Sequence, residues 1–437
     1  MSKVIVAGGG LAGMAGAAAL ATAGFEVEIF EARGFPGGRA TSYPLAGEGE
    51  LIDNCQHILL RCCVNLLDFY RRLGVADKIR FHREFYFIEP GGKTSILGAG
   101  PLPAPLHLMG SFFRLRFLGL SDKLAIARAL MAVRRERRRM DLDRITMLAW
   151  LQEQRQTHAA VDRFWRPVLV SAINEEPERI AALYGLQCFH LGFLASSRSY
   201  EMGVPSAPLS ELYRPESWHA LPGVRLRLRA PVDRIVVENS MAVGVESGGE
   251  RHTADAVICA VPFERVSGLA PELGLDFTGW EHSPITGIHL WFDRPVTELP
   301  HGALLDRTIQ WFFNKSGGRY LQIVVSASRS LVEMGRSEVI ELAVRELGEF
   351  LPAVREARLE KAHVVKEVRA TFSAKPGLQA KRAEPRTAIG GLYLAGDWTR
   401  TAWPATMEGA VRSGYRAAEA VAADAGVRAS FLLPDLA

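Results

Sequence analysis

Apolar and polar positions follow a regular pattern in the first thirty-one residues. Residues 4–7 are an unbroken apolar run, typical of a buried strand, and residues 26–30 alternate as a second strand does. The alanine-rich stretch 11–23 between them predicts a helix that ends at Gly24. The pattern therefore predicts a strand–helix–strand unit at the start of the chain.

The rest of the chain alternates between strand patterns and helix patterns. Hairpins are predicted around the turns at 90–92 and 317–318, the second among three strands between residues 286 and 325. Further strands are predicted at 223–229, 232–237, 242–245, 256–262, 363–370 and 392–395. Helices are predicted at 64–73, 121–140, 337–351 and 405–423, the second and third capped by Ser121 and Ser337, and in segments up to residue 194. At 437 residues the chain is long enough for two domains, so an α/β fold of two domains with mixed sheets and helices is predicted.

A glycine motif lies inside the first unit. Gly8, Gly10 and Gly13 have the G-x-G-x-x-G spacing directly after the first strand, and the second strand ends at Glu31. The first glycine permits the turn, the second lets the backbone approach a pyrophosphate, and the third lets helix and strand pack closely. Strand, helix, spacing and acid together predict dinucleotide binding, with Glu31 on a ribose diol. A signal peptide or membrane span is the alternative for the uncharged stretch 4–25, but its six glycines and the acids after it argue against both.

Two polar loops follow this unit. Gly37-Gly38-Arg39 stands where a NAD-dependent dehydrogenase usually continues with a plain βα unit. A glycine doublet there lets the backbone pass close to the middle of a cofactor longer than one nucleotide; an ordinary turn is the alternative. Further on, Asp, Asn, Gln and His crowd into residues 53–57 between apolar neighbours, which is unusual for a core strand.

A further acid stands near the end of the chain. Gly396 and Asp397 end a buried strand, and a helix begins at about Ala405. If this strand closes the same sheet, Asp397 meets a polar group of the same cofactor, and the helix N-terminus offers N–H groups to a partial negative charge. A flavin dinucleotide uses such a second clamp, whereas NAD does not need it. The alternative is an aspartate that caps the helix.

Together these three motifs resemble the FAD-binding signature of the amine oxidase and phytoene desaturase superfamily. The resemblance covers nearly the whole chain. It implies a discontinuous Rossmann-like FAD domain (1–75, 205–275 and 385–428) interleaved with a substrate domain (76–204 and 276–384) of mixed sheet and helices. It implies FAD as cofactor, bound by Gly8, Gly10, Leu11, Ala12, Gly13, Glu31, Ala32, Gly38, Arg39, Val232, Gly396, Asp397, Ala405 and Met407.

The resemblance also implies a role for several of these residues. Glu31 would hold the adenosine ribose and Val232 would back the adenine. Arg39 would lie near the pyrophosphate and Asp397 near the ribityl chain. Met407 would offer its N–H group to the flavin C2 carbonyl.

Within the superfamily, residues 53–57 are similar to the Asp-Asn-Gly-Gln-His motif of the hydroxysqualene dehydroxylases of hopanoid biosynthesis. The helix after that motif and the stretch 403–408 also fit. Cys55 stands where that family usually has glycine, so a slightly different loop is expected, and Cys62-Cys63 is atypical. The resemblance implies that hydride from reduced flavin replaces an allylic hydroxyl of a C30 isoprenoid in a dry cavity.

That reaction needs a proton donor, and Asp53 and His57 are the candidate catalytic residues. The alternatives are a histidine bonded to backbone or cofactor and an aspartate that braces the loop. Six aromatic residues are candidates for the cavity wall: Phe112, Phe113, Phe189, Phe193, Trp291 and Trp311. The alternative for each is an ordinary position in the hydrophobic core. Rival functions are a carotenoid-type desaturase with the opposite electron flow, an amine oxidase, for which no clear aromatic cage is visible, and a FAD-containing lipid-binding protein without turnover.

Basic charge is concentrated in one segment. The chain carries a net charge of +4, whereas residues 112–140 alone carry +7, so the remainder is −3. Segment 106–140 mixes apolar residues with arginine, which predicts contact with an anionic membrane surface through Phe112, Phe113, Phe117, Leu120 and the arginines at 114, 116 and 134–139. A solvated basic helix end or a buried apolar helix is the alternative. No stretch after the glycine motif reaches 18 uninterrupted apolar residues, so no spanning helix is expected.

The cysteines and the basic segment together predict where the protein is located and what it binds. The five cysteines are odd in number and form no C-x-x-C, which favours a reducing compartment and no metal site. A cytoplasmic protein, peripheral at the inner face of the membrane, is predicted. The expected partners are a C30 isoprenoid substrate and enzymes of the squalene-synthase type, and no nucleic acid.

Overall fold

The protein has two structural halves, and one of them is built on a five-stranded parallel sheet. The computed structural model describes residues 2–45, 49–218 and 221–436. The strand order is β10-β2-β1-β14-β20, and every neighbouring pair is parallel. The strands are β1 (Lys3–Ala7), β2 (Glu26–Glu31), β10 (Val224–Leu228), β14 (Ala256–Cys259) and β20 (Leu392–Leu394). Three distant parts of the chain therefore meet in one sheet.

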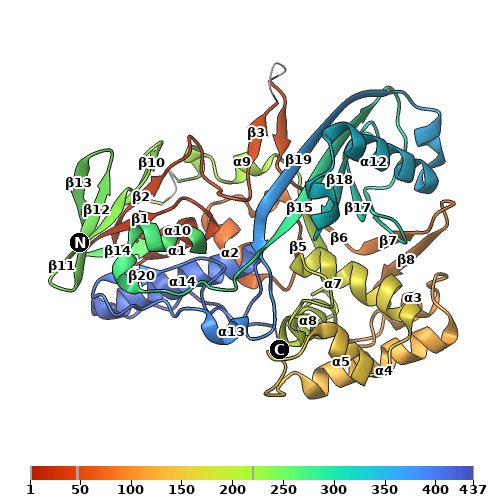
Figure 1. The fold of residues 1–437 in the computed structure, drawn as a ribbon, viewed down its shortest axis with the longest axis horizontal. Helices are drawn as coiled ribbons and strands as arrows, with labels where there is room; N and C mark the ends of the chain where they lie inside the picture. The colour runs from red at the N-terminus through yellow and green to blue at the C-terminus, as the bar shows by residue number, and fades with distance from the viewer. Residues whose placement is uncertain (1, 46–48, 219–220, 437) are drawn as a thin grey trace.

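Two helices from opposite ends of the chain pack against this sheet side by side (Figure 1). They are α1 (Leu11–Thr22) and α14 (Met407–Asp424). Gly414 permits the close contact, since a Cβ atom there would lie 2.1 Å from the carbonyl oxygen of Ala12. A three-stranded antiparallel sheet belongs to the same half: β11 (Arg234–Glu238), β12 (Met241–Ser247) and β13 (Glu250–Thr253).

The second half is built on a seven-stranded sheet in the order β19-β15-β18-β17-β16-β7-β8. Its strands are β7 (Glu84–Ile88), β8 (Thr94–Gly98), β15 (His282–Phe292), β16 (His301–Leu304), β17 (Trp311–Ser316), β18 (Tyr320–Ser326) and β19 (Leu359–Phe372). Apolar side chains of one face pack with α12 (Arg336–Phe350), and those of the other face pack with helices from residues 109–194. The sheet is therefore covered on both sides (Figure 1).

Short elements join the two halves. A small sheet, β5 (Leu59–Leu60), β9 (Met202–Pro205) and β6 (Ile79–His82), crosses the predicted limits at 75 and 204, and those limits stay a prediction. A hairpin pairs β3 (Ser42–Pro44) with β4 (Leu51–Asp53). The other α-helices are α2 (Val64–Arg72), α3 (Met109–Phe113), α4 (Leu120–Glu136), α5 (Met147–Glu153), α6 (His158–Ala160), α7 (Arg166–Ile173), α8 (Ala182–Phe189), α9 (Leu209–Leu212), α10 (Phe263–Leu269), α11 (Arg329–Val332) and α13 (Leu378–Lys381).

Two predicted helix caps are wrong. α4 begins one residue before Ser121, and Gly119 is its N-cap, with its N–H group donated to Asp122 at 2.9 Å. α12 likewise begins before Ser337, and the N–H group of its N-cap, Gly335, is donated to Glu338 at 2.9 Å. In both helices an acidic side chain at the third position reaches back to the cap residue, which stabilises an earlier start.

Candidate functional site

One large cavity connects the two halves. It has a volume of about 2080 Å³ and is lined by the first glycine motif, the loops at 37–40 and 54–60, the start of α14, and residues of α3, α4, α7 and α8. A pocket for one small ligand usually measures ~300–1,000 Å³. The cavity therefore has room for a dinucleotide and for a second, long ligand.

The glycines of the first motif form one end of this cavity. Gly8 has a φ of +114°, and a Cβ atom there would lie 2.7 Å from the carbonyl oxygen of Ala260. A Cβ atom at Gly13 would lie 2.0 Å from the carbonyl oxygen of Gly8, although Gly13 itself lies behind the lining. Gly10 differs, because its Cβ atom would meet only the Cα atom of Gly38, at 3.9 Å, and otherwise enters the cavity. The free space lies at the N-terminus of α1, with Leu11 and Ala12 beside it, where a pyrophosphate binds in such units.

Glu31 is held in place at the same end. Its two carboxylate oxygens accept the N–H groups of Gly9 and Arg33, each at 2.8 Å, and the side chain is buried. Each oxygen keeps a further lone pair for a ribose hydroxyl group. Ala32 and Val232 line the cavity next to Glu31. These positions suit the adenosine part of a dinucleotide.

Arg39 and Asp397 form an ion pair in the cavity wall. Arg39 Nη2 lies 2.7 Å from Asp397 Oδ1, and Arg39 Nη1 donates to the carbonyl oxygen of Ala370 at 3.0 Å. The loop residues Gly38 and Gly396 line the cavity beside them. The segments that carry the second and third motifs are therefore in direct contact, although they are 358 residues apart.

The start of α14 also faces the cavity, through Ala405 and Met407. Thr406 is the N-cap of this helix, because its hydroxyl oxygen accepts the N–H group of Gly409 at 3.0 Å. The interpretation of Asp397 as the helix cap is therefore wrong. The N-terminus of α14 points at the same space as the N-terminus of α1, so two helix ends are available to a charged cofactor.

Asp53 lies outside this cavity lining, in contrast to the prediction. Its carboxylate accepts the Ser42 hydroxyl at 2.7 Å and the Leu209 N–H at 2.9 Å, and Lys315 Nζ lies 3.1 Å away. Asp53 is the last residue of β4, and the chain turns after it, so its side chain points into the protein rather than into the cavity. This carboxylate braces the loop and is not placed to protonate a ligand.

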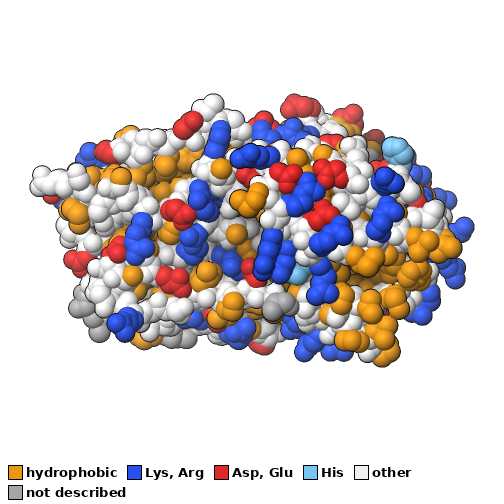
Figure 2. Space-filling model, turned by 90° about the horizontal axis from the view of Figure 1, so that it is seen from below, with side chains coloured by type: hydrophobic (Ala, Val, Ile, Leu, Met, Phe, Trp, Pro, Cys, Tyr) orange, Lys and Arg blue, Asp and Glu red, His pale blue; other side chains and the backbone are white. Residues whose placement is uncertain are grey.

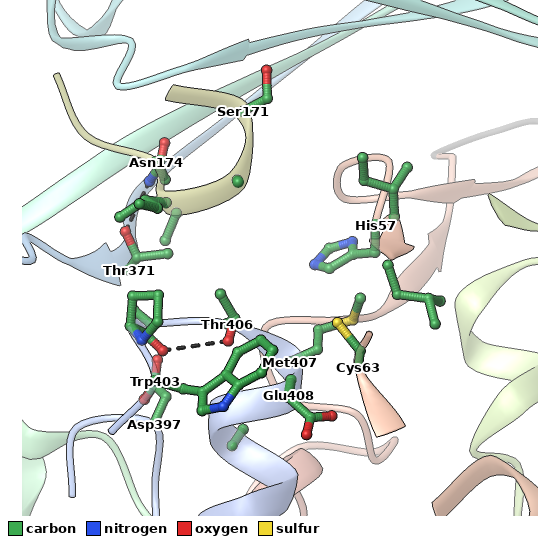
Figure 3. Close-up of a pocket in the computed structure, with 18 of the residues that line it drawn as sticks. His57, Cys63, Ser171, Asn174, Thr371, Asp397, Trp403, Thr406, Met407 and Glu408 are labelled. Atoms are coloured by element: carbon green, nitrogen blue, oxygen red, sulfur yellow. Dashed lines mark hydrogen bonds between the residues drawn. The ribbon is translucent and has the colours of Figure 1, made fainter. Parts of the chain in front are cut away.

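His57 does face the cavity (Figure 3). Its Nδ1 atom lies 2.9 Å from the carbonyl oxygen of Cys55, and because a carbonyl only accepts, Nδ1 carries the proton. Burial lowers the pKa of His57, partly offset by the Cys55 carbonyl and Asp53, so the ring is neutral at pH 7. Its Nε2 atom is then a proton acceptor. Cys55 does not have a positive φ, which explains why this loop does not need glycine there.

Aromatic side chains form the wall beyond His57. Five of the six predicted wall residues line the cavity, namely Phe112, Phe113, Phe189, Phe193 and Trp311. Trp291 is the exception: its ring stacks on Tyr320 at 4.3 Å, and its indole N–H is donated to Glu50 at 3.2 Å. The prediction missed wall residues on strands and helices, because their facing depends on how the sheet packs: Phe85, Phe87, Phe164 and Phe313, with the polar residues Ser171, Asn174 and Thr371 (Figure 3).

The cavity reaches the surface at α3 and α4. Seen from below, hydrophobic side chains gather at one end of the molecule with lysine and arginine around them (Figure 2). Leu120, Leu124 and Met131 of α4 are 66%, 56% and 68% exposed, and Met131, Arg134 and Arg135 line the cavity. The spacing of the three apolar residues places them on one face of the helix.

Part of the predicted membrane contact is wrong. Phe112 and Phe117 are buried in the protein core, whereas Phe113 and Leu120 are exposed. Arg139 is occupied by ion pairs with Asp141 and Glu153, both at 2.7 Å. In the described part of the chain, no helix is long and apolar enough to cross a membrane.

Comparison with known proteins places these features in context. The family model described as flavin containing amine oxidoreductase matches residues 11–422. The chain is 31% identical to a hydroxysqualene dehydroxylase of Rhodopseudomonas palustris, over 97% of this chain and 99% of that one. It is 25% identical to a probable zeta-carotene desaturase of Synechococcus elongatus, over 96% and 98% of the two chains. A solved structure of putrescine oxidase shares the fold, with a TM-score of 0.73, 18% identity, and coverage of 97% and 99%.

These findings give FAD as the cofactor. The cavity fits it, since the open space at Gly10, the fixed Glu31 carboxylate and the second helix end at Met407 lie along one lining. The protein is thus a flavin oxidoreductase with an α/β fold of two domains.

Proposed function

Because the chain belongs to the flavin containing amine oxidoreductase family, we propose that it reduces hydroxysqualene to squalene, in squalene and hopanoid biosynthesis. One observation carries the proposal: a single cavity runs from the FAD cradle past His57 and along an aromatic wall to the exposed apolar face of α4. A long isoprenoid needs such a path, and a small polar amine does not. The motif at 53–57 and two hydroxysqualene dehydroxylase relatives, 31% and 28% identical, support this choice of substrate.

Reduced FAD supplies the hydride in this reaction. The aromatic wall excludes water and encloses the apolar chain. Neutral His57 orients the hydroxyl group of the substrate by accepting its hydrogen at Nε2, and protonated His57 donates a proton to the same oxygen as it leaves as water. The protonated, donating form of His57 becomes more abundant as the pH falls, and its lowered pKa moves this rise to lower pH.

A second candidate function is favoured by the same histidine. A desaturase of the carotenoid type removes hydride from its substrate and needs a base to accept the remaining proton. A neutral His57 in the cavity lining is suited to that task at pH 7, and the relatives named as desaturases are 24–25% identical over nearly the whole chain. The two reactions predict opposite pH dependences, since one uses protonated His57 and the other uses neutral His57.

Product analysis tests the proposal. The enzyme with chemically reduced FAD is incubated anaerobically with hydroxysqualene, and the lipid extract is analysed by mass. We expect squalene, with one flavin oxidised per product, at a rate that rises as the pH falls. Oxidised enzyme that instead introduces double bonds into a carotene precursor would favour the desaturase. Reduced flavin that neither substrate oxidises in stopped flow would favour a binding protein without turnover.

We further propose that the protein collects its lipid at the inner face of the cytoplasmic membrane, where enzymes of the squalene-synthase type release it. The apolar residues Leu120, Leu124 and Met131 would enter the interface, and the exposed Arg134 and Arg138 would lie among phosphates, at ~1 kcal/mol each. The mouth of the cavity at Met131 would then open into the lipid.

Flotation with anionic liposomes tests this placement. Serine at Leu120, Leu124 and Met131 should abolish binding, whereas serine at Met241, which is 48% exposed on β12, is the matched control and should leave it unchanged. Glutamine at Arg134 and Arg138 should weaken binding, and salt should weaken it for the wild type. Equal binding to neutral vesicles at high salt, or none at all, would contradict the model.

A further inference from the structure

The segment that follows α14 turns back toward the cofactor end of the cavity. The backbone N–H groups of Phe431 and Leu432 both donate to Glu419 Oε1, at 2.7 and 2.9 Å, so the turn is fixed to the outer part of α14. The side chain of Phe431 is buried against Tyr415. Residues 431–436 therefore lie on the protein in a defined path, which we call the strap.

The strap holds one wall of the cavity through Asp435. The carboxylate oxygen Oδ1 of Asp435 accepts Arg412 Nη1 at 2.8 Å and the indole N–H of Trp403 at 3.2 Å. The Arg412 guanidinium carbon also lies 5.6 Å from the centre of the Trp403 ring. Trp403 is buried in the cavity lining, two residues before Ala405 and four before Met407 (Figure 3). The orientation of this indole ring is thus set by a residue of the strap.

The strap holds the opposite wall through Asn65. The amide oxygen of Asn65 accepts the N–H group of Leu433 at 2.8 Å, and its Nδ2 atom donates to the carbonyl oxygen of Leu433 at 3.2 Å. The same Nδ2 atom donates to Glu408 Oε1 at 2.9 Å, and Glu408 Oε2 accepts the N–H group of Leu66 at 2.8 Å. Asn65 and Glu408 are buried, and Leu66 and Glu408 both line the cavity.

We propose that the strap is a positioning element for FAD: it ties the wall at residues 65–66 to the wall at residues 403–408, and Asp435 is the positioning residue for Trp403. The network joins three segments of the chain, and both of its branches end on residues that line the cavity, Trp403 in one and Glu408 with Leu66 in the other. Loss of the strap therefore loosens two walls of the cavity that would hold the cofactor. Cofactor affinity should respond more strongly than global stability.

A pair of matched variants tests this role by FAD binding alone, so the result does not depend on the identity of the substrate. Asp435→Ala removes the contacts to Arg412 and Trp403. Asp424→Ala is the control at the other end of α14, because it also removes an arginine pair, to Arg386 at 3.0 Å, and a hydrogen bond, from Tyr393 at 2.8 Å. We expect Asp435→Ala to weaken FAD binding by about 5–150-fold, the usual range for coupling between sites, and to change the flavin circular dichroism. Asp424→Ala should do neither.

Asp435→Asn keeps an oxygen for both donors and should restore wild-type FAD binding. If Asp435→Ala and Asp424→Ala change FAD affinity equally, or if neither changes it, the positioning role is wrong. A second measurement avoids any failure of a variant to fold: a protease site is placed between Arg428 and Ala429, and the strap is cut in the folded holoenzyme. FAD should then dissociate faster, and an unchanged dissociation rate would overturn the proposal.

Discussion

Alanine at Gly10 or at Gly13 adds the same methyl group to the same turn, with different expected consequences. At Gly13 the new Cβ atom would lie 2.0 Å from the carbonyl oxygen of Gly8 and 3.0 Å from Val6 Cγ1. The first of these atoms is backbone and cannot move aside cheaply. Overpacking of this kind costs ~1–3 kcal/mol or more, so Gly13→Ala should lower the stability of the protein even without cofactor.

Gly10→Ala should leave the apoprotein nearly unchanged. Gly10 has a φ of −77°, which alanine adopts freely, and a Cβ atom there would lie 3.9 Å from its nearest neighbour, the Cα atom of Gly38. An alanine N-cap costs roughly 0.5–1 kcal/mol, which is offset by the ~0.4–1 kcal/mol gained from a less flexible unfolded chain. The methyl group would instead occupy the space for the pyrophosphate. Losing two charge-assisted hydrogen bonds at ~1.5–3 kcal/mol each weakens FAD binding by more than about a hundredfold.

The assay is thermal unfolding of both apoproteins, followed by FAD titration of each. We expect Gly10→Ala to unfold with the wild type and to bind FAD poorly, and Gly13→Ala to unfold at a lower temperature. Wild-type FAD affinity in Gly10→Ala would refute the placement of the pyrophosphate at this helix end. Equal destabilisation of the two apoproteins would refute the claim that a Cβ atom is crowded at Gly13 and has space at Gly10.

Three further predictions concern titratable side chains. Glu31→Gln presents an amide donor to the N–H groups of Gly9 or Arg33 and should weaken FAD binding by ~1–3 kcal/mol in a titration; unchanged affinity would remove Glu31 from the ribose role. His57→Ala should keep FAD and lose ~10²–10⁴-fold in turnover, and a near wild-type rate would place the proton transfer elsewhere. Burial lowers the pKa of His289 to about 3 and of His301 to about 4, so the unfolded chain takes up protons below pH ~6.5 that the folded protein does not. The free energy of unfolding should therefore fall from pH 6.5 towards pH 4 in denaturant titrations, and a flat profile would contradict this.

Local signals in the sequence were sufficient for much of the fold and for the cofactor. The first glycine motif lies within one short unit, so strand, turn and helix follow from neighbouring residues, and β1, α1 and β2 lie where the pattern predicts them. The role of Asp397 could not be settled from neighbouring residues, because it depends on which side chain Asp397 contacts in the folded protein. The ion pair with Arg39, 358 residues away, supplied that partner, which no local pattern indicates.

Asp53 shows why sequence spacing failed for one catalytic candidate. Two residues four positions apart share a face within a regular helix or a regular strand, but not across a turn. β4 ends at Asp53, and the turn after it sends His57 into the cavity and Asp53 toward Lys315. The protonation state of His57 was equally out of reach, because it depends on the Cys55 carbonyl and on burial.

Helix α4 carries two apolar faces, and composition alone does not say which one is buried. The small residues Ala125 and Ala129 face the core with Ile126, whereas the larger Leu120, Leu124 and Met131 face outward. Leaving a large aliphatic side chain in water instead of burying it costs ~1.5–3 kcal/mol, and soluble monomers seldom expose several of them together. Stability alone would favour the reverse arrangement. The outward face therefore supports our proposal that an anionic lipid surface covers it, because arginines adjoin it at the cavity mouth.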